Sequence, residues 1–372
     1  MSVKNTKVAI GLSGGVDSSL AAILLKEKGY DVFGLTMKIY NNDLDIEMDT
    51  SHACYGPDEQ EDIEMAEKLC IQIEIPYHTI DLRHEYQKHV LKYFKQEYLA
   101  GRTPNPCIKC NQTMKFGFLL DKAQEQGLEF DYFATGHYAR IDRTGDRPIL
   151  KKARDRKKDQ SYFLYKLPQQ KLAEILFPLG DLTKQEVRKL AQKYNVQSAE
   201  RAESQDFIAG KDYSVLFAEK NVKPGAIVDV EGNRLGTHKG LIHYTIGQRK
   251  GLGISHSEPL YVLGKDAENN KIIVTERENL FARGLIANNI NMFKNIRRDT
   301  KYRAKAKIRK NQQEVDVNYR LIEDCLKVEF KNPMVAVTPG QSLVLYNDDL
   351  VIGGGIIKES RPLKTEPVNA IN

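Results

Sequence analysis

The 372 residues exceed the roughly 250–300 at which one hydrophobic core usually stops growing, so two or three domains are expected. Hydrophobic residues make up 41% and charged residues 28%, which excludes a chain that is disordered throughout. No apolar run approaches the ~18 residues of a membrane span, and the N-terminus leads directly into a strand pattern rather than a cleavable signal. We therefore expect a cytoplasmic protein without a membrane partner.

The net charge of +6 is unevenly distributed. Residues 147–158 contain seven basic residues and one acidic residue, and residues 294–310 contain nine and one. Residues 43–67, in contrast, contain ten acidic residues and no Lys or Arg. Such runs are typical of solvated surfaces, but two basic segments in one chain also fit a polyanion partner. The motifs have to identify that partner.

The first half alternates strand and helix patterns. Residues 7–12 (KVAIGL) predict a buried strand, SGGVDSS predicts a glycine turn, and SLAAILLKEKG predicts a helix that ends at Gly29. Further strands are predicted at residues 31–37, 75–81 and 131–135. Strands that alternate with helices indicate an α/β domain with a parallel sheet and a ligand crevice at the strand ends.

The loop at residues 13–19 has the composition of an anion-binding turn. Gly14 and Gly15 allow a sharp bend, and backbone amides and serine hydroxyls can point at an anion on the helix N-terminus. Asp17 suits a magnesium or a capping role. The loop lacks the lysine of the common γ-phosphate motif. SGGxDS resembles the pyrophosphate-binding loop of ATP pyrophosphatases, which cleave ATP to AMP and pyrophosphate; a serine-capped glycine turn is the structural alternative.

The five cysteines are an odd number in an intracellular-looking chain, so structural disulfides are not expected. Cys107 and Cys110 form a Cys-x-x-Cys pair in the stretch PNPCIKCN. This spacing is compatible with a redox pair, metal ligands or a nucleophile. Cys54 follows the second predicted strand and is expected on the crevice side, whereas Cys70 and Cys325 are expected in cores.

After about residue 210 the pattern changes to short β runs separated by Gly, Asn and Asp turns, which indicates β-rich modules. The motifs of the whole chain together resemble the tRNA-specific 2-thiouridylases, PP-loop ATP pyrophosphatases that place sulfur on C2 of the wobble uridine. The resemblance extends over GLSGGVDSS, LTMK, GRTPNPCIKCN, MKF, ATGHYAR, KDQSYFL, HYTIGQRKGLGI and VTPGQ.

The resemblance implies a fold of three parts. A Rossmann-like PP-loop catalytic domain with a parallel sheet would occupy residues 1–209, a small central β-rich domain residues 210–280, and a C-terminal β-barrel that binds tRNA residues 281–372. The fold class is therefore expected to be α/β followed by two β modules.

Carried over position by position, the resemblance also implies three sets of site residues. The ATP-binding set is Gly11, Leu12, Ser13, Gly14, Gly15, Val16, Asp17, Ser18, Met37 and Gly136. The tRNA-binding set is Asn105, Pro106, Cys107, His137, Lys158, Asp159, Gln160, Arg309, Lys310 and Gln341. The catalytic set is Cys110, Cys107 and Asp17, with ATP and Mg²⁺ as cofactors. Structural alternatives are a packed strand-end histidine for His137, a turn residue for Gln341 and a core residue for Met37.

Two departures from the family concern sulfur chemistry. Most family members carry Asp-x-x-Cys after Pro-Asn-Pro, so Cys107 replaces the aspartate and Cys110 takes the usual cysteine position. They also carry a second catalytic cysteine in a Ser-x-x-Ile-Cys-Phe-like stretch, whereas the corresponding residues 203–208 (ESQDFI) contain none. A relay from that distal cysteine therefore cannot be transferred to this chain unchanged.

Three arrangements of the cysteines follow. Cys54, Cys107 and Cys110 are candidate ligands of a 4Fe–4S cluster whose open iron would hold a hydrosulfide. A persulfide and disulfide mechanism with Cys107 and Cys110 is the second. The third is a zinc site completed by His52, or cysteines with a purely structural role. The acidic run around Cys54 disfavours its thiolate.

The sequence thus predicts an ATP-dependent tRNA sulfurtransferase in which the uridine C2 oxygen is adenylated and sulfur then replaces AMP. The resemblance implies the lysine, glutamate and glutamine tRNAs as substrates, and a cysteine desulfurase, with or without relay proteins, as the sulfur source. The alternatives are a related PP-loop thiolase that acts on another tRNA base, and an RNA-binding protein without catalysis. The missing distal cysteine favours the last alternative, and the intact SGGVDSS loop opposes it.

Overall fold

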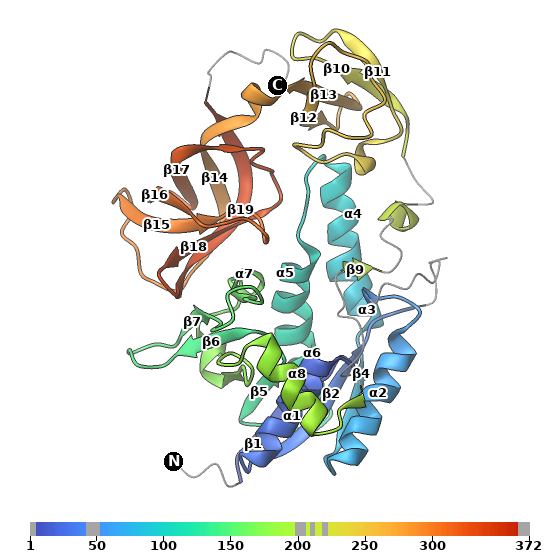
Figure 1. The fold of residues 1–372 in the computed structure, drawn as a ribbon, viewed down its shortest axis with the longest axis vertical. Coiled ribbons are helices and arrows are strands. Elements are labelled where there is room, and N and C mark those ends of the chain that lie inside the picture. Colours follow the sequence, from blue (N-terminus) through green and yellow to red (C-terminus); the bar gives the residue numbers. More distant parts are fainter. Residues whose placement is uncertain (1–4, 42–52, 198–205, 209–212, 218–221, 364–372) are drawn as a thin grey trace. The chain divides into compact units, whose positions relative to one another are not determined.

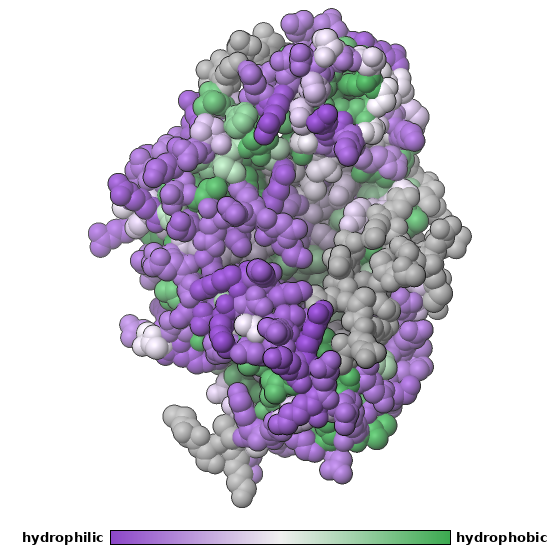
Figure 2. Space-filling model, viewed as in Figure 1, coloured by the Kyte–Doolittle hydropathy of each residue, from purple (hydrophilic) through white to green (hydrophobic). Residues whose placement is uncertain are grey.

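A computed structural model describes residues 5–41, 53–197, 206–208, 213–217 and 222–363 (Figure 1). The chain divides into two compact units. The first comprises Met1–Val90, Pro106–Tyr213 and Asp349–Val351, and the second comprises Leu91–Asn105, Ser214–Asp348 and Ile352–Asn372. Within the described ranges, no helix is both long and apolar enough to cross a membrane. The face drawn in Figure 2 is mostly hydrophilic, with apolar side chains in small patches.

A five-stranded parallel sheet forms the centre of the first unit, in the order β4-β2-β1-β5-β8. Its strands are β1 (Lys7–Gly11), β2 (Asp31–Lys38), β4 (Tyr77–Asp81), β5 (Tyr132–Thr135) and β8 (Ile175–Leu176). The parallel sheet and its first four strands confirm the sequence prediction. The additional strand β8 is two residues long, which is too short to leave a recognisable pattern.

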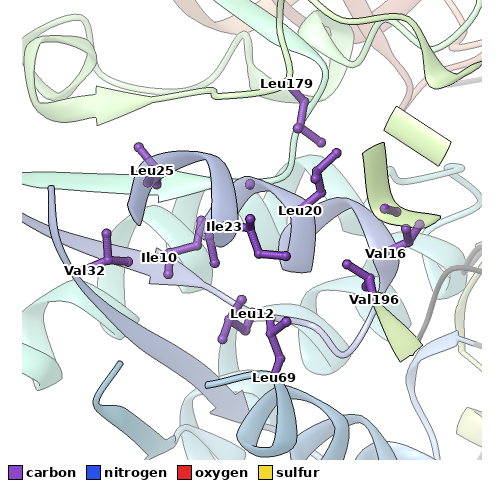
Figure 3. Packing of buried hydrophobic residues seen from close by; sticks show 14 of the residues in the cluster. Ile10, Leu12, Val16, Leu20, Ile23, Leu25, Val32, Leu69, Leu179 and Val196 are labelled. Atoms are coloured by element: carbon purple, nitrogen blue, oxygen red, sulfur yellow. The ribbon is translucent and has the colours of Figure 1, made fainter. Parts of the chain in front are cut away.

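The core of the first unit is built around α1 (Val16–Glu27), most of whose residues are buried. Figure 3 shows Leu20 and Ile23 of α1 among the apolar residues of β1 and the loop after it. Helix α8 (Lys184–Lys193) contributes Val187 and Ala191 to the same core. The remaining helices of this unit are α2 (Glu59–Gln72), α3 (Arg83–Tyr86), α5 (Pro106–Cys110), α6 (Leu119–Glu125), α7 (Ser161–Leu164) and the 3₁₀ turn η3 (Gln170–Glu174).

Two wider, π-helical segments interrupt the α-helices: η1 (Gln87–Leu91) and η2 (Asn111–Phe118). Segment η2 joins α5 to α6, so the helical stretch that begins at the Cys-x-x-Cys pair continues to Glu125. Because π-helical turns often occur at functional sites, η2 draws attention to the side chains that follow Cys110.

Smaller strands complete the first unit. β6 (Ala139–Asp142) and β7 (Ile149–Lys152) form an antiparallel hairpin. β3 (Ala53–Tyr55), which carries Cys54, pairs in parallel with β9 (Asp206–Ile208). Residues 203–205, which begin the stretch that corresponds to the family's second cysteine, lie outside the described residues, as does His52.

The second unit contains α4 (Lys92–Leu99) and a four-stranded sheet with the order β11-β10-β13-β12. Ile227, Val262 and Val274 form the centre of its core. The strands of this sheet are β10 (Gly225–Val228), β11 (Arg234–His238), β12 (Leu260–Asp266) and β13 (Lys271–Glu276). The 3₁₀ turns along this stretch of the chain are η5 (Tyr213–Phe217), η6 (Leu241–His243) and η7 (Arg277–Leu280).

The C-terminal strands form a six-stranded barrel in the order β14-β17-β16-β15-β18-β19, closed by pairing between β14 and β19. They are β14 (Phe281–Met292), β15 (Tyr302–Lys307), β16 (Val315–Ile322), β17 (Cys325–Val335), β18 (Ser342–Asn347) and β19 (Leu350–Pro362). Burial alternates along β17, where Leu326 and Val328 point into the barrel. The expected barrel is therefore confirmed. Cys325 is half-exposed, so its core assignment was wrong, whereas Cys70 is buried as expected.

Candidate active site

A cavity of about 310 Å³ lies at the carboxyl ends of β1, β2 and β5. It is lined by the loop after β1, the ends of these strands, the start of α2 and the helical stretch after the cysteine pair. All of the expected ATP-binding residues except Gly14 line it, namely Gly11, Leu12, Ser13, Gly15, Val16, Asp17, Ser18, Met37 and Gly136. A ligand at this place would follow the general rule for parallel α/β sheets.

The glycine turn packs closely against α2. Gly14 has a φ of +68°, and a Cβ there would lie 2.8 Å from backbone atoms of Asp62, so a larger residue is excluded both by conformation and by space. Gly15 precedes α1 and caps it without a side chain. The first residues of α1 line the cavity and no side chain caps the helix, which is the arrangement of an anion site at a helix N-terminus.

Contrary to what the sequence had suggested, the hydroxyls of Ser18 and Ser19 do not point at an anion site. Ser18 and Ser19 both donate their hydroxyl hydrogens to the carbonyl oxygen of Gly15, at 3.1 and 3.0 Å. Since a hydroxyl has one hydrogen to donate, these two side chains close the first helical turn instead of pointing at an anion. Ser13 Oγ lies 3.3 Å from Ser18 Oγ at the edge of the cavity.

Asp17 is bound by two side chains from distant parts of the first unit. Lys184 Nζ lies 2.8 Å from both carboxylate oxygens, and the Tyr138 hydroxyl donates to Oδ1 at 2.8 Å. The Lys184 side chain is 9% exposed and that of Asp17 29%. The carboxylate proposed to assist a magnesium ion is thus charge-paired within the protein.

The cysteines converge in part. Cys54 and Cys110 both line the cavity, whereas Cys107, which is half-buried one turn before Cys110, does not. All three thiols act electrostatically on Lys115, which also lines the cavity. Burial by itself would lower the pKa of Lys115, but the thiolate charges outweigh it and the net shift is upward.

Lys115 influences two other groups in the cavity. Burial raises the pKa of the Cys110 thiol to about 11, and the Lys115 charge opposes this rise. Burial and the same charge lower the pKa of His137 to about 3, so its ring is neutral near pH 7. His137 Nδ1 lies 2.8 Å from Thr135 Oγ1, which holds the ring at the cavity wall. A tRNA contact by His137 stays a prediction.

The cysteines and the carboxylates near the cavity differ in how well they suit the metals that the sequence suggested. In the part of the chain that the structure describes, no three His, Cys, Asp or Glu side chains are grouped closely enough to hold a metal ion. The three cysteines as they stand therefore do not fit the expected 4Fe–4S cluster. Mg²⁺ is usually held by one or two carboxylates and the phosphates of a nucleotide. Asp17 and Asp62, which line the cavity beside the glycine turn, fit that pattern.

Several cavity residues were not predicted from the sequence. Glu59 and Asp62 belong to the acidic run around Cys54, to which no site residue was assigned, yet they line the cavity. Glu59 accepts the amides of Ile39 and Tyr40 at 2.6 and 2.9 Å, and burial raises its pKa. Lys115 lies in the MKF motif, which contributed to the family resemblance without a role. A lone acidic or basic residue in such a run carries no local signal of its position.

The expected tRNA-binding residues fall in different surroundings. In the first unit, Pro106 begins α5, Gln160 lines the cavity, and Lys158 and Asp159 belong to the loop before α7. Of the remaining six, Cys107 and His137 belong to the first unit, and Asn105, Arg309, Lys310 and Gln341 belong to the second.

In the second unit, side chains of two expected tRNA ligands are engaged by the protein. Gln341 donates to the carbonyl oxygens of Thr103 and Pro104, and Arg309 donates to Thr338 Oγ1 at 2.8 Å. Lys310 is exposed.

Three family models match the chain in order. Residues 6–209 match the tRNA methyl transferase HUP domain, residues 214–276 the tRNA methyl transferase PRC-barrel domain, and residues 282–357 the aminomethyltransferase β-barrel domain. The two compact units are divided differently, because the segment at residues 91–105 groups with the second unit. The domain boundaries at residues 209 and 280 stay predictions.

Curated relatives match over nearly the full length. The tRNA-specific 2-thiouridylase MnmA 1 of Caldanaerobacter subterraneus subsp. tengcongensis is 45% identical, with 95% of this chain and 98% of that protein covered. The tRNA-specific 2-thiouridylase MnmA of Acetivibrio thermocellus is 43% identical, with 95% and 99% covered. Among solved structures, a 4-thiouridine synthetase–RNA complex with bound ATP aligns at a TM-score of 0.34 and 15% identity, over 53% of this chain and 43% of the other. That likeness is too weak to support an argument.

Proposed function

Because the chain belongs to the tRNA-specific 2-thiouridylase family, we propose that it uses ATP to activate C2 of the wobble uridine of tRNA and replaces the C2 oxygen by sulfur. One observation carries the proposal. The cavity at the strand ends contains the SGGVDS loop, suited to a pyrophosphate, and the thiol of Cys110, suited to sulfur delivery. Nucleotide activation and sulfur transfer can therefore take place on one bound base.

The first step is adenylation of the base. The uridine C2 oxygen attacks the α-phosphorus of ATP, the bond to the β-phosphate oxygen breaks, and pyrophosphate leaves. The amides at the start of α1 stabilise negative charge on the leaving group. Mg²⁺ carried by the nucleotide, with Asp17 and Asp62 as its candidate carboxylates, would supply charge neutralisation there.

The second step transfers sulfur from a persulfide on Cys110. Its terminal sulfur attacks C2, and the bond between C2 and the oxygen of AMP breaks. A second thiolate, from Cys107 in the sequence-based proposal, attacks the Cys110 sulfur, which releases 2-thiouridine and leaves a disulfide. A small thiol reductant must then reduce the disulfide before the next turnover. Cys54, which lines the same cavity as Cys110, is the other candidate for the second thiol.

The reaction also requires a sulfur donor and specific tRNA substrates. A cysteine desulfurase, directly or through relay proteins, would load the persulfide. The lysine, glutamate and glutamine tRNAs would be the substrates, and the reaction would take place in the cytoplasm. The two basic segments support a tRNA partner, because neutralised phosphates dominate the affinity of proteins for nucleic acids.

The test combines anaerobically prepared protein, ATP, Mg²⁺, a tRNA transcript, a cysteine desulfurase with cysteine, and a thiol reductant. We expect AMP and 2-thiouridine in equal amounts, and neither product with a transcript that has cytidine at the wobble position. Cys110→Ala should abolish 2-thiouridine. Absence of tRNA-dependent AMP release from the wild-type protein would refute the proposal, and a thiolated base at another position would favour the related thiolase.

The same preparation tests the iron–sulfur alternative. Iron and sulfide analysis with absorption spectroscopy is applied to wild type, Cys54→Ala and Cys107→Ala. A colourless, iron-free and fully active wild-type protein supports the persulfide route. Stoichiometric iron and sulfide that are lost in both variants would show instead that the three thiols close around a cluster. If the wild-type protein is iron-free and active, the variant that releases AMP but stalls with the base held on Cys110 through the disulfide identifies the second thiol.

A further inference from the structure

Two separate series of hydrogen bonds connect the carboxylate of Asp17 to one surface loop. The first series begins at Lys184, whose Nζ binds both carboxylate oxygens while its backbone N–H donates to Asp155 Oδ2 at 3.0 Å. Asp155 belongs to the loop at residues 153–160, which contains basic residues of the first charged run. One residue thus connects the glycine turn to this basic loop.

The second series runs through Tyr138. Its hydroxyl donates to Asp17 Oδ1, its backbone N–H donates to Gln160 Oε1 at 2.8 Å, and its carbonyl oxygen accepts the Gln160 N–H at 2.8 Å. Gln160 is the last residue of the basic loop and lines the cavity. Asp155 and Gln160 of the loop are therefore each joined to Asp17 through a single intervening residue.

The loop itself is folded around the side chains of two aspartates, Asp155 and Asp159. Asp159 Oδ1 accepts the Ala153 amide at 2.9 Å and Oδ2 accepts the Ser161 hydroxyl at 2.8 Å. Asp155 Oδ1 accepts the Lys157 amide at 3.0 Å. Backbone hydrogen bonds by both aspartate side chains hold the loop in one shape.

Arg154 gives this loop a contact that an RNA phosphate can replace. Its Nη1 lies 3.2 Å from Glu186 Oε2, and both side chains are about half exposed. Such exposed pairs contribute little, so a phosphate can compete for the guanidinium at small cost. Glu186 in turn closes the capping box with Thr183 at the start of α8, next to Lys184. Arg154 is therefore connected through Glu186 to the helix end that holds Asp17.

We propose that Lys184 and Tyr138 are positioning residues that couple occupation of the basic loop by the phosphate backbone of tRNA to the geometry of the ATP-binding glycine turn. The inference rests on the proposed function, because it requires a tRNA and a nucleotide on one protein. The coupling is reciprocal by thermodynamic necessity: tRNA tightens ATP binding by the factor by which ATP tightens tRNA binding. Typical couplings of this kind amount to about 5- to 150-fold.

The experiment measures the dissociation constant of α,β-methylene-ATP, whose α–β bond cannot be cleaved, with and without saturating tRNA transcript. The ratio of the two constants is the readout, because a purely structural defect lowers both affinities alike. Tyr138→Phe removes the hydroxyl, and Lys184→Met removes the ion pair. The control Lys189→Met removes an exposed charge on the same helix.

We expect a ratio of at least about fivefold for wild type and Lys189→Met, and a ratio near one for Lys184→Met and Tyr138→Phe, with partial recovery in Lys184→Arg. Thermal unfolding and tRNA binding verify that each variant is folded. A folded Lys184→Met or Tyr138→Phe protein that keeps the wild-type ratio would overturn the inference. A wild-type ratio of one with both ligands bound would overturn it as well and leave the proposed function intact, whereas a wild-type protein that binds no tRNA contradicts the proposed function itself.

Discussion

Gln341 donates its side-chain amide to the carbonyl oxygen of Thr103 at 2.9 Å. The same amide reaches the carbonyl oxygen of Pro104 at 3.3 Å, and Thr103 donates its own amide to Pro339 at 3.0 Å. Both partners belong to the second unit. The VTPGQ motif therefore binds the backbone that leads to Asn105, and this contact explains the glutamine without a tRNA ligand.

Gly340 is expected to be essential for this docking. It has a φ of +91°, and a Cβ there would lie 2.9 Å from three backbone atoms of Thr103. Gly340→Ala should therefore weaken the contact by about 1–3 kcal/mol more than the conformational cost of alanine alone. Hydrogen exchange of the Thr103 amide measures this directly, since each 1.4 kcal/mol corresponds to about tenfold faster exchange through the open state.

Gly232→Ala is the matched control, because Gly232 has the same φ of +91° and no atom lies within 4 Å of the place that a Cβ would take there. It should leave exchange at Thr103 unchanged. Equal protection of Thr103 in Gly340→Ala and wild type would show that the motif does not hold this segment.

Cys110 is expected to react slowly with alkylating reagents at neutral pH. Its pKa is raised to about 11, so the thiolate fraction at pH 8 is about one in a thousand. The sign follows from the thiolate being the nucleophile: the alkylation rate should rise about tenfold per pH unit and level off near pH 11. Iodoacetamide labelling of iron-free protein, followed by peptide mass spectrometry of Cys110, gives the profile.

Replacing Lys115 by Met should slow this alkylation further, because the Lys115 charge lowers the pKa of Cys110 against the effect of burial. Lys68→Met, at an exposed lysine of α2, should have no effect. A rate that is already constant between pH 7 and pH 9 would mean that the cavity stabilises the thiolate, contrary to the structure.

Local patterns were sufficient to predict the first helix and four of the five strands of the parallel sheet. The run KVAIGL, the glycine turn and the apolar helix are contiguous, and each follows from hydrophobic periodicity and turn chemistry. β1 and α1 occupy the predicted places, and the cavity forms where parallel strands end. The pairing of β3 with β9 was not predictable, because strands of three residues pair over a long sequence separation without a pattern of their own.

The surroundings of Asp17 also depend on tertiary structure. Lys184 lies 167 residues from Asp17 and begins a helix whose amphipathic pattern predicts only which face is buried. Lys184 shares that face with Val187 and Ala191, three and seven residues later, which turns its side chain toward the core. From sequence alone it resembles any other lysine in a basic chain, so Asp17 was assigned to magnesium without its partner.

Gly136 is expected to tolerate no side chain. A Cβ there would lie 2.7 Å from the amide nitrogen of Ser18 and 2.8 Å from the carbonyl carbon of Asp17. Because backbone cannot move aside cheaply, Gly136→Ala should displace the glycine turn and reduce tRNA-dependent AMP release about 100-fold. Gly145→Ala, whose Cβ would meet nothing within 4 Å, is the control. Wild-type turnover in Gly136→Ala would refute the packing of β5 against the turn.

Substitution of Arg309 should lower the stability of the protein, whereas substitution of Lys310 should change tRNA binding, although both residues were expected to bind tRNA. The guanidinium of Arg309 is half-buried and donates to Thr338 and to the Ala336 carbonyl, so Arg309→Ala should destabilise the protein by about 1–3 kcal/mol in thermal unfolding. Exposed Lys310 should instead act on phosphates: Lys310→Ala should keep the unfolding temperature and reduce by about one the slope of log binding constant against log salt. Lys271→Ala, at an exposed lysine of β13, should change neither quantity. An unchanged salt slope in Lys310→Ala would remove this residue from the tRNA-binding set. If Lys310 did contact a phosphate, tRNA binding by the variant would release fewer counterions and the slope would fall.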